Sequence, residues 1–257
     1  MDMTTDLIEM DELASTNDYA KKYASGLVAD AGRITVITAR HQTKGRGQMG
    51  NTWESEDGKN LLFSILCHPL YIRANAQYVL SAAIALSTCA AIKEMMGEAY
   101  ADHIRIKWPN DIYYKDKKMA GILIENDLMG STIRNSIIGV GIDVNQTIFV
   151  SDAPNPISMA DIGGREYNCS YLLNSIIDRF ATMLESLQNN TEESAGHIFE
   201  EYMNTLFRND GNPYRFKDAI GEFDARITDV DRTGRITLTD VAGTHRRYEF
   251  KEVSFIL

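Results

Sequence analysis

Basic residues and glycines alternate in one short stretch of the sequence, KGRGQMG. Its glycines allow backbone N–H groups to converge on one point, and they flank two cations, Lys44 and Arg46. Converging donors together with a guanidinium group favour a bound anion, above all a phosphate. The stretch therefore predicts an anion-binding loop. The alternative is a surface loop that is basic without a function.

The glycines of this stretch, Gly45, Gly47 and Gly50, also have the G-x-G-x-x-G spacing of a dinucleotide-binding fingerprint. That fingerprint needs a helix directly after the glycines and an acidic residue about 20 positions later. Here the turn-forming residues NTWESEDGKN follow, and no Asp or Glu lies between Asp57 and Glu94. The P-loop signature is absent as well. The sequence therefore argues against a Rossmann-type nucleotide site.

A second group of charged residues lies in the stretch IKWPNDIYYKDKKMAGILIE. Lys107, Asp111 and Lys118 surround two strand-like runs joined by a polar turn, which predicts a hairpin. Farther along, Gly139 and Gly141 fall on one face of another predicted strand. Glycine inside a strand indicates that another group approaches the backbone closely there. These patterns predict a site built on neighbouring strands.

Helical and strand patterns alternate through the first four fifths of the chain. Ser15 or Thr16 is a good N-cap for the first helix, which Gly32 ends. Helices are predicted over residues 16–31, 75–96, 170–188 and 191–206, and strands over 33–39, 60–70, 104–108, 111–114, 119–126 and 131–146. After residue 206 four short alternating runs, separated by turns, predict a small β-barrel of SH3 type.

Composition restricts the class of protein further. The net charge of −10 argues against nucleic acid and anionic membranes as partners, because both attract basic surfaces. Three scattered cysteines, Cys67, Cys89 and Cys169, indicate inert thiols in a reducing compartment rather than a zinc site. The acidic N-terminus lacks the features of a signal peptide, and no apolar run is expected to be long enough to span a bilayer. A cytoplasmic protein is expected.

Four motifs appear in the order found in biotin protein ligases, also called biotin–[acetyl-CoA-carboxylase] ligases, and the chain resembles that family. They are QTKGRGQMGNTW, KWPNDIYY, KKMAGILIE and GVGIDVN, and STN at 15–17 and the β-rich tail extend the resemblance over nearly the whole chain. The resemblance implies an α/β (α+β) fold. A mixed-sheet catalytic domain over residues 1–206 would precede an SH3-like module over 207–257. That catalytic domain is shared with lipoate ligases and is distantly similar to class II aminoacyl-tRNA synthetases. A winged-helix domain cannot fit before Ser15, so a repressor function is not expected.

The resemblance implies two half-reactions. Biotin and ATP, with Mg²⁺, first give biotinyl-5′-AMP and pyrophosphate, and the biotinyl group then passes to a lysine of a biotin carboxyl carrier domain. Whether the chain forms a homodimer stays open. One alternative is a lipoate or octanoate ligase, but the R-R-x-S-G-G-G loop of those relatives is absent. Another is a non-catalytic biotin-binding protein, and its sign would be the loss of Arg46 or Lys118, both of which are present.

The resemblance also implies the site residues, with the metal ligands undetermined. Arg46 would clamp phosphate, Lys118 would hold the biotin carboxylate and α-phosphate together, and Asp111 would position Mg²⁺ or the incoming lysine. The implied biotin-binding residues are Ser15, Thr16, Asn17, Gln42, Arg46, Gly47, Gln48, Lys118, Gly121, Gly139, Gly141 and Ile142. Those implied for ATP and the adenylate are Lys44, Gly45, Arg46, Gly47, Trp53, Lys118, Asp143 and Asn145, with Lys251 near the nucleotide.

Two positions depart from the family's pattern. Gln48 stands where the family often has arginine, and Asn51 stands where some members carry one. Both changes remove positive charge from the loop, so retention of the adenylate would rest more on Arg46, Lys118 and Trp53. We expect Trp53 to pack on adenine and Trp108 to belong to the core. The loop over residues 40–57 is expected to be disordered or mobile without ligand and ordered with it.

Overall fold

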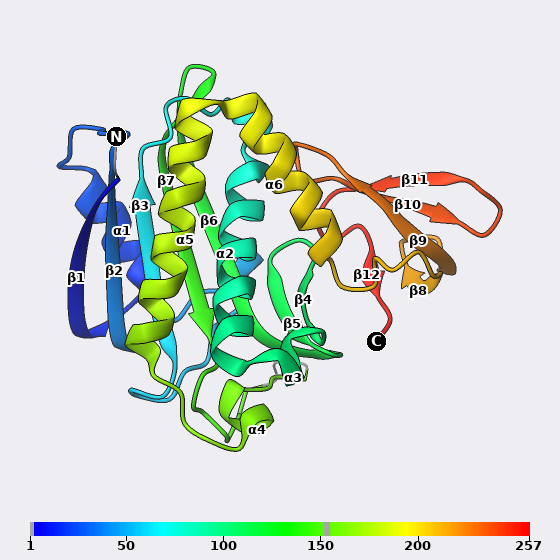
Figure 1. Ribbon diagram of the computed structural model, residues 1–257, viewed down its shortest axis with the longest axis horizontal. Helices are drawn as coiled ribbons and strands as arrows, with labels where there is room; N and C mark the ends of the chain where they lie inside the picture. The colour runs from blue at the N-terminus through cyan, green and yellow to red at the C-terminus, as the bar shows by residue number, and fades with distance from the viewer. Residues whose placement is uncertain (1–2, 152–154) are drawn as a thin grey trace.

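A seven-stranded mixed sheet forms the centre of the computed structural model, which describes residues 3–151 and 155–257 (Figure 1). The strand order is β1-β2-β3-β7-β6-β5-β4, with β1 parallel to β2 and the other pairs antiparallel. The strands are β1 (Thr4–Leu13), β2 (Arg33–Gln42), β3 (Leu61–Cys67), β4 (Ile104–Lys107), β5 (Asp111–Tyr114), β6 (Lys117–Met129) and β7 (Thr132–Ile142).

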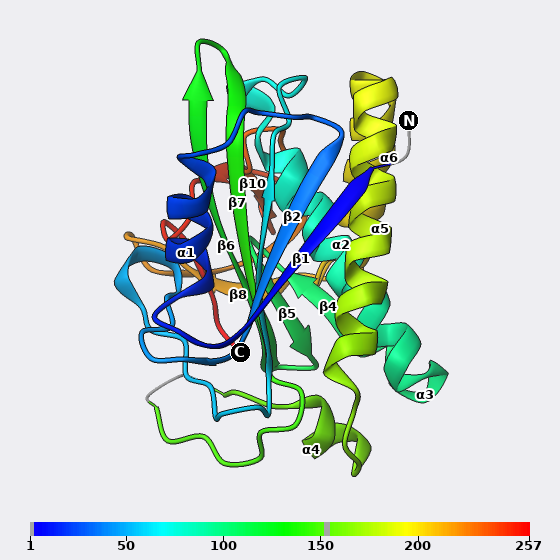
Figure 2. The ribbon, with the colours of Figure 1, turned by 90° about the vertical axis from the view of Figure 1, so that its left-hand side faces the viewer.

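Helices cover both faces of this sheet, as Figure 2 shows. Three long helices, α2 (Tyr78–Met96), α5 (Cys169–Asn189) and α6 (Thr191–Thr205), pack on one face and enclose the main hydrophobic core. The single helix α1 (Thr16–Ala24) lies on the other face over a small separate cluster that includes Ala20 and Ile137. Short helices α3 (Glu98–Ala101) and α4 (Met159–Gly163) and the 3-10 turns η1 (Gln48–Gly50) and η2 (Ala74–Ala76) complete this part.

Helix α2 is the central helix of the main core. Together with η2 it forms, among the described residues, one helix over Ala74–Met96 that is long and apolar enough to cross a membrane, so the expectation that no run reaches that length was wrong. Of its most apolar window, 72% is buried inside the fold. Burial between the sheet and two helices explains why its sequence is apolar on every side.

Residues after Leu206 form a second, five-stranded sheet at one end of the molecule (Figure 1). Its strands are β8 (Tyr214–Lys217), β9 (Glu222–Val230), β10 (Ile236–Asp240), β11 (His245–Tyr248) and β12 (Ser254–Phe255), in the order β11-β10-β9-β8-β12. The sheet is consistent with an SH3-like module, but β11 and β12 do not pair, so no barrel closes within the described residues. We propose Leu206 as the boundary between the two parts.

Most predicted elements occupy the expected places, with two local differences. Helix α1 ends at Ala24 rather than residue 31, because Ser25 turns back to bond the carbonyl of Lys22 through its backbone N–H and its hydroxyl. Strand β1 was not predicted. It is an edge strand that carries four acidic residues and pairs only with β2, so its apolar alternation is weak.

Candidate active site

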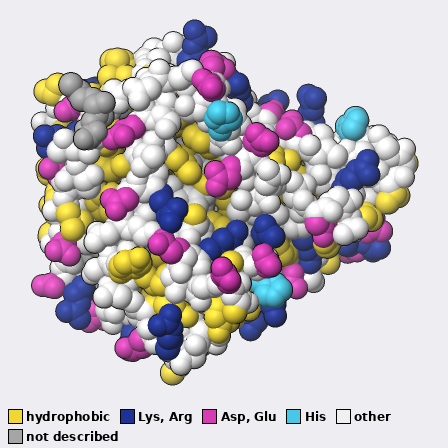
Figure 3. Space-filling view, viewed as in Figure 1, with side chains coloured by type: hydrophobic (Ala, Val, Ile, Leu, Met, Phe, Trp, Pro, Cys, Tyr) yellow, Lys and Arg dark blue, Asp and Glu magenta, His cyan; other side chains and the backbone are white. Residues whose placement is uncertain are grey.

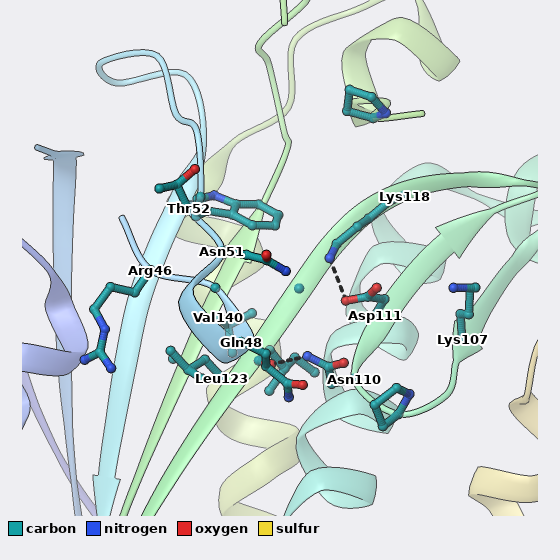
Figure 4. Close-up of a pocket in the computed structure, with 18 of the residues that line it drawn as sticks. Arg46, Gln48, Asn51, Thr52, Lys107, Asn110, Asp111, Lys118, Leu123 and Val140 are labelled. Carbon is teal, nitrogen blue, oxygen red and sulfur yellow. Dashed lines mark hydrogen bonds and ion pairs between the residues drawn. The ribbon is translucent and has the colours of Figure 1, made fainter. Parts of the chain in front are cut away.

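A cavity of about 950 Å³ opens where the glycine loop, α1, the strands β5 to β7 and the second sheet meet. Figure 4 shows Arg46 at one side of it and Lys118 with Asp111 at the other, with Gln48 and Asn51 between them. Most of the predicted site residues line this cavity: Ser15, Thr16, Asn17, Gln42, Arg46, Gly47, Gln48, Trp53, Asp111, Lys118, Gly121, Gly139, Gly141, Asp143 and Lys251. The structure thus brings together motifs that lie far apart in the sequence.

The side of the cavity below α1 is a network of uncharged polar groups, which we call the amide end: Thr16, Asn17, Gln42 and Ser64. The Oε1 atom of Gln42 accepts hydrogen bonds from the backbone N–H and the hydroxyl of Thr16, at 2.7 and 3.1 Å. The hydroxyl of Ser64 lies 2.7 Å from Thr16 Oγ1 and 2.6 Å from Asn17 Oδ1. All but Gln42 are buried. These bonds fix the rotamers of the network without any ligand.

Helix α1 holds two members of the amide end through its N-terminal turn. Ser15 is the N-cap, and its hydroxyl accepts from the backbone N–H of Asp18, so Thr16 and Asn17 occupy the first turn. Their side chains consequently point from the start of the helix toward the sheet, where Ser64 is buried on β3. The capping and ligand-site interpretations of STN are therefore compatible, because different atoms are involved.

Glycines on β6 and β7 allow two side chains to approach the sheet closely. A Cβ added at Gly139 would lie 2.2 Å from Asn17 Oδ1, and one at Gly141 would lie 2.5 Å from Trp53 Cε2. At Gly121 a Cβ would lie 3.0 Å from Trp53 Cζ3. The predicted close approach is thus present, and the approaching groups belong to the chain itself. The Trp53 indole N–H is buried in this cavity wall without a hydrogen-bond partner among the described residues.

The opposite side of the cavity, the lysine end, consists of Lys107, Asp111, Lys118 and Asp143. Lys118 Nζ lies 2.7 Å from Asp111 Oδ1 and 5.7 Å from the centre of the Trp53 ring. Lys107 Nζ lies over the ring of Tyr113 at 4.9 Å and forms no ion pair within the described residues. Burial lowers the pKa of Lys107, and the positive charge of Lys118 lowers it further, against the opposing charge of Asp111. A bound anion would offset the repulsion between the positive charges of Lys107 and Lys118.

Asp143 lies almost fully buried at the lysine end, near Lys118. Burial raises its pKa well above the ordinary value for aspartate, although the charge of Lys118 acts in the opposite direction. Its Oδ1 accepts a hydrogen bond of 3.2 Å from the amide of Asn60, and the other end of that amide accepts from the backbone N–H of Val144. The shift moves Asp143 toward its neutral form.

Four predicted site residues lie outside the lining of the cavity. Ile142 is fully buried in the main core, because side chains alternate along β7 and its neighbour Gly141 faces the cavity. Asn145 uses its side-chain amide to bond the backbone of Tyr167 at 2.8 and 2.9 Å. Gly45 packs against the backbone of Trp53, and Lys44 is exposed to solvent. In this arrangement these four residues do not line the cavity, and their contacts with a ligand stay predictions.

The glycine loop folds back on itself instead of presenting all its N–H groups to the cavity. The N–H of Gly47 donates to Asn51 and that of Trp53 donates to Gly45, so two donors of the expected anion cradle are used inside the loop. The Arg46 guanidinium pairs with Asp18 at 2.6 Å and Glu125 at 3.3 Å, at the side of the cavity away from Lys118 (Figure 4). Its role as a phosphate clamp stays a prediction.

Sequence reasoning missed several lining residues. Asn110 lies within the quoted motif KWPND, so its position next to Asp111 was a usable signal, whereas Lys107 had been singled out together with Asp111 and Lys118. Leu123 and Val140 form part of the apolar wall of the cavity. The alternation of side chains along β6 could have indicated that Leu123 faces it. Four residues of the C-terminal module had no such signal, because their contribution depends on how that module packs: Phe250, Val253, Ser254 and Phe255. Trp108 is buried as expected, and its edge also reaches the cavity.

Charged groups elsewhere on the surface do not form a patch of one sign on the face in Figure 3. Lys and Arg side chains are interspersed there with Asp and Glu. Hydrophobic side chains are also exposed on that face, scattered among the charged ones.

Comparison with known proteins identifies relatives of this arrangement. Residues 11–143 match the model of the biotin/lipoate A/B protein ligase family. The chain is 27% identical over 248 residues to the bifunctional ligase/repressor BirA of Bacillus subtilis, covering 94% of this chain and 72% of that protein. It is 30% identical over 132 residues to a biotin–[acetyl-CoA-carboxylase] ligase of Paracoccus denitrificans, covering 51% of each.

Among solved structures, the fold is similar to that of a biotin protein ligase from Aquifex aeolicus in complex with biotin and ATP. The TM-score is 0.74 at 24% identity, and the similarity covers 97% of both chains. The expected mixed-sheet fold with a C-terminal β module is therefore confirmed.

Proposed function

The chain belongs to the biotin/lipoate A/B protein ligase family, and on that premise we propose that it is an ATP-dependent biotin–protein ligase, a biotin–[acetyl-CoA-carboxylase] ligase. The observation that carries the proposal is the division of one cavity into an uncharged amide end and a cationic lysine end. A substrate that is neutral and polar at one end and anionic at the other fits this division. Biotin, with its ureido ring and its carboxylate, is such a substrate.

The amide end binds the ureido ring in this proposal. A ureido group offers one carbonyl acceptor and two N–H donors, and the side chains of Thr16, Asn17 and Gln42 supply both kinds of partner. Because their hydrogen bonds are already arranged, little rotamer entropy is lost on binding. Gly139 and Gly141 leave room for Asn17 and Trp53 against the sheet beside the ring, and Leu123 and Val140 provide apolar contact.

The lysine end brings the biotin carboxylate and the α-phosphate of MgATP together. The carboxylate oxygen attacks the α-phosphorus, the bond to the bridging oxygen of the β-phosphate breaks, and pyrophosphate leaves with that electron pair. Lys118 and Lys107 offset the negative charges that meet there, which is the main requirement of such a step. Mg²⁺ enters as part of the nucleotide substrate. Trp53 supplies an aromatic face for adenine.

The second step transfers the biotinyl group to a lysine of a biotin carboxyl carrier domain. The uncharged ε-amine of that lysine attacks the acyl carbon, the bond to the AMP oxygen breaks, and AMP leaves. The amine loses a proton as the amide forms. In this proposal Asp111, whose carboxylate already pairs with Lys118, binds the incoming lysine as its ammonium ion, which loses a proton to water before the uncharged amine attacks. We assign the reaction to the cytoplasm, where the free thiols of Cys67 and Cys89 stay reduced.

Pyrophosphate release from the purified protein tests the proposed function. MgATP is supplied with biotin or with lipoate, first alone and then with a carrier domain, and the carrier is weighed by mass spectrometry. We expect release with biotin alone and a biotinyl mass increase on one carrier lysine. Turnover with lipoate instead of biotin would identify the protein as a lipoate ligase of the same family. Binding of biotin without pyrophosphate release would contradict an enzymatic function.

A further inference from the structure

One carboxylate connects the amide end of the cavity to the glycine loop. Glu125 Oε2 accepts a hydrogen bond of 3.1 Å from the Asn17 amide, and its two oxygens lie 3.3 and 3.5 Å from Arg46 nitrogens. Asp18 Oδ1 accepts a further bond of 2.6 Å from Arg46. The exposed fraction of the side chain is 24% for Glu125, 42% for Arg46 and 46% for Asp18. Glu125 is therefore the more buried of the two carboxylates that hold the guanidinium.

The orientation of the Asn17 amide depends on Glu125. Its carbonyl oxygen faces the hydroxyl of Ser64 at 2.6 Å, and its amide nitrogen faces Glu125 and the backbone carbonyl of Leu123. A carboxylate accepts hydrogen bonds only, so it selects the nitrogen of the amide. This choice turns the oxygen of Asn17 toward the cavity side that faces Gly139. Glu125, which is not part of the amide end, thus determines which end of the Asn17 amide faces the ring-binding side of the cavity.

The attachment of the glycine loop depends on Arg46. Within residues 45–53, the described hydrogen bonds that leave the loop come from the Arg46 side chain, and the others join loop residues to one another. Removing its partners would free the loop without changing the loop's own sequence. The sequence separation between Arg46 and Glu125 is 79 residues, so this attachment is a tertiary contact.

We propose that Glu125 is a positioning residue that serves both the ring-binding Asn17 and the loop-fastening Arg46, with Asp18 as the second carboxylate of the fastening. The proposal rests on the proposed function for the identity of the ring, which is the ureido ring of biotin. Because one carboxylate orders both Asn17 and Arg46, the ring site and the attachment of the glycine loop form together. Arg46 then contributes to biotin affinity by holding the loop, in addition to any contact with phosphate.

Two substitutions of Glu125 separate its two tasks. Glu125→Gln keeps an acceptor for Asn17 and removes the charge that holds Arg46, whereas Glu125→Ala removes both. We expect KM for biotin to rise about two- to fivefold in Glu125→Gln, as for loss of a half-exposed ion pair. In Glu125→Ala it rises about tenfold or more, because Asn17 also loses its partner. In both variants kcat at saturating biotin stays within about twofold, as for loss of uniform binding.

Limited proteolysis reports the fastening independently of activity. Trypsin cleavage after Lys44, followed by mass spectrometry on the ligand-free protein, is expected to accelerate severalfold in Asp18→Asn and Glu125→Gln. Asp11→Asn, an exposed carboxylate change on β1, is the matched control and leaves the rate unchanged. Equal cleavage rates in all four proteins would overturn the proposal. If the wild-type protein releases no pyrophosphate with biotin, the proposed function fails while this test still decides the fastening.

A double-mutant cycle with Arg46→Gln tests whether the carboxylates act through Arg46. We expect Asp18→Asn to change the cleavage rate after Lys44 in the wild-type background and to have no further effect in the Arg46→Gln background. Full additivity of the two changes would show that Asp18 acts elsewhere and would contradict the proposal. Thermal unfolding of each variant distinguishes loss of the loop contact from loss of the fold, because a local release leaves the melting temperature nearly unchanged.

Discussion

The two ends of the cavity differ in how far their polar groups are satisfied without a ligand. At the amide end the side chains of Thr16, Asn17 and Gln42 already bond one another and their surroundings. At the lysine end Asp111 pairs with Lys118, and Lys107 forms no ion pair within the described residues. Burial shifts Asp143 toward its neutral form, and the Trp53 indole N–H has no described partner. The polar groups of the amide end have partners within the protein, whereas the positive charge of the lysine end is fully compensated only when an anion binds.

This difference indicates a division of work between affinity and chemistry. A preorganised neutral network can select a ring by shape and hydrogen bonding, with little reorganisation when the ring binds. A surplus of positive charge is useful where negative charge gathers during the reaction. Substitutions at the amide end should therefore change mainly KM for biotin, and substitutions at the lysine end should change mainly kcat. The predictions that follow test this division.

Lys118→Ala should have the largest effect. It removes the cation that we place between the carboxylate and the α-phosphate, so biotin-dependent pyrophosphate release should fall by about 10²–10³ in kcat. Lys117→Ala, an exposed neighbour on the same strand, is the control and should keep wild-type turnover. An equal small loss in both variants would mean that the lysine end does not carry the chemistry.

Gly139→Ala should disrupt the amide end. The new Cβ would meet Asn17 Oδ1 at 2.2 Å, so Asn17 must move away from Ser64. A displacement of this size is expected to lower kcat/KM for biotin by roughly 10²-fold. Gly196→Ala is the control, because a Cβ there meets no atom within 4 Å and the site is helical. Steady-state kinetics on both variants would show whether the glycine is required for binding.

Thr16→Val should give a smaller loss confined to binding. It keeps the shape of the side chain and removes the hydroxyl between Gln42 and Ser64, which leaves two polar partners partly unsatisfied. We expect KM for biotin to rise about tenfold with kcat nearly unchanged. Thr5→Val on the exposed edge strand serves as the control. A fall in kcat with unchanged KM would break the proposed division between the two ends.

Lys107→Arg should shift the pH dependence of the reaction. Phosphate binding needs Lys107 protonated, and burial lowers its pKa, so kcat/KM for ATP should fall as pH rises through that lowered pKa. Arginine stays charged over this range, so the alkaline limb of the profile should move to higher pH in the variant. The measurement is kcat/KM for ATP against pH. An unchanged alkaline limb would mean that another group sets it.

Asp143→Asn should stabilise the fold slightly above acidic pH. The unfolded chain ionises this aspartate above about pH 4, whereas burial raises its pKa in the fold, so the wild type loses stability as pH rises between those two values. Asparagine avoids this cost and still accepts from Asn60. We expect a melting temperature higher by about 2–4 °C at pH 7 and no difference near pH 3. A lower melting temperature at pH 7 would mean that the native carboxylate is ionised.

Much of the site could be predicted from the sequence because its parts are local motifs. The order of the glycine loop, the KWPND hairpin and the two-glycine strand was sufficient to collect Lys118, Asp111 and Gly139 into one cavity. Periodicity also located the long helices and the central strands. Ile142 lies in the main core, because the alternation of a strand puts it on the opposite face from Gly141, and its role in the biotin site stays a prediction.

Other features depend on tertiary arrangement and left no local signal. Glu125 meets Arg46 across 79 residues of sequence, and this contact requires the final packing of α1 and the glycine loop beside β6. The lining residues near Phe255 reach the cavity only through the packing of the second sheet. Whether that sheet closes into a barrel depends on the pairing of its edge strands, which alternating patterns do not specify.

Calorimetric titration of two ligands into three proteins tests the division of the cavity most directly. The two ligands are MgATP and biotinamide, in which a neutral amide replaces the carboxylate of biotin. The three proteins are the wild type, Thr16→Val and Lys118→Ala. The account predicts that Thr16→Val weakens biotinamide binding about tenfold and leaves MgATP binding unchanged, and that Lys118→Ala does the reverse. Equal weakening of both ligands by each substitution would contradict it.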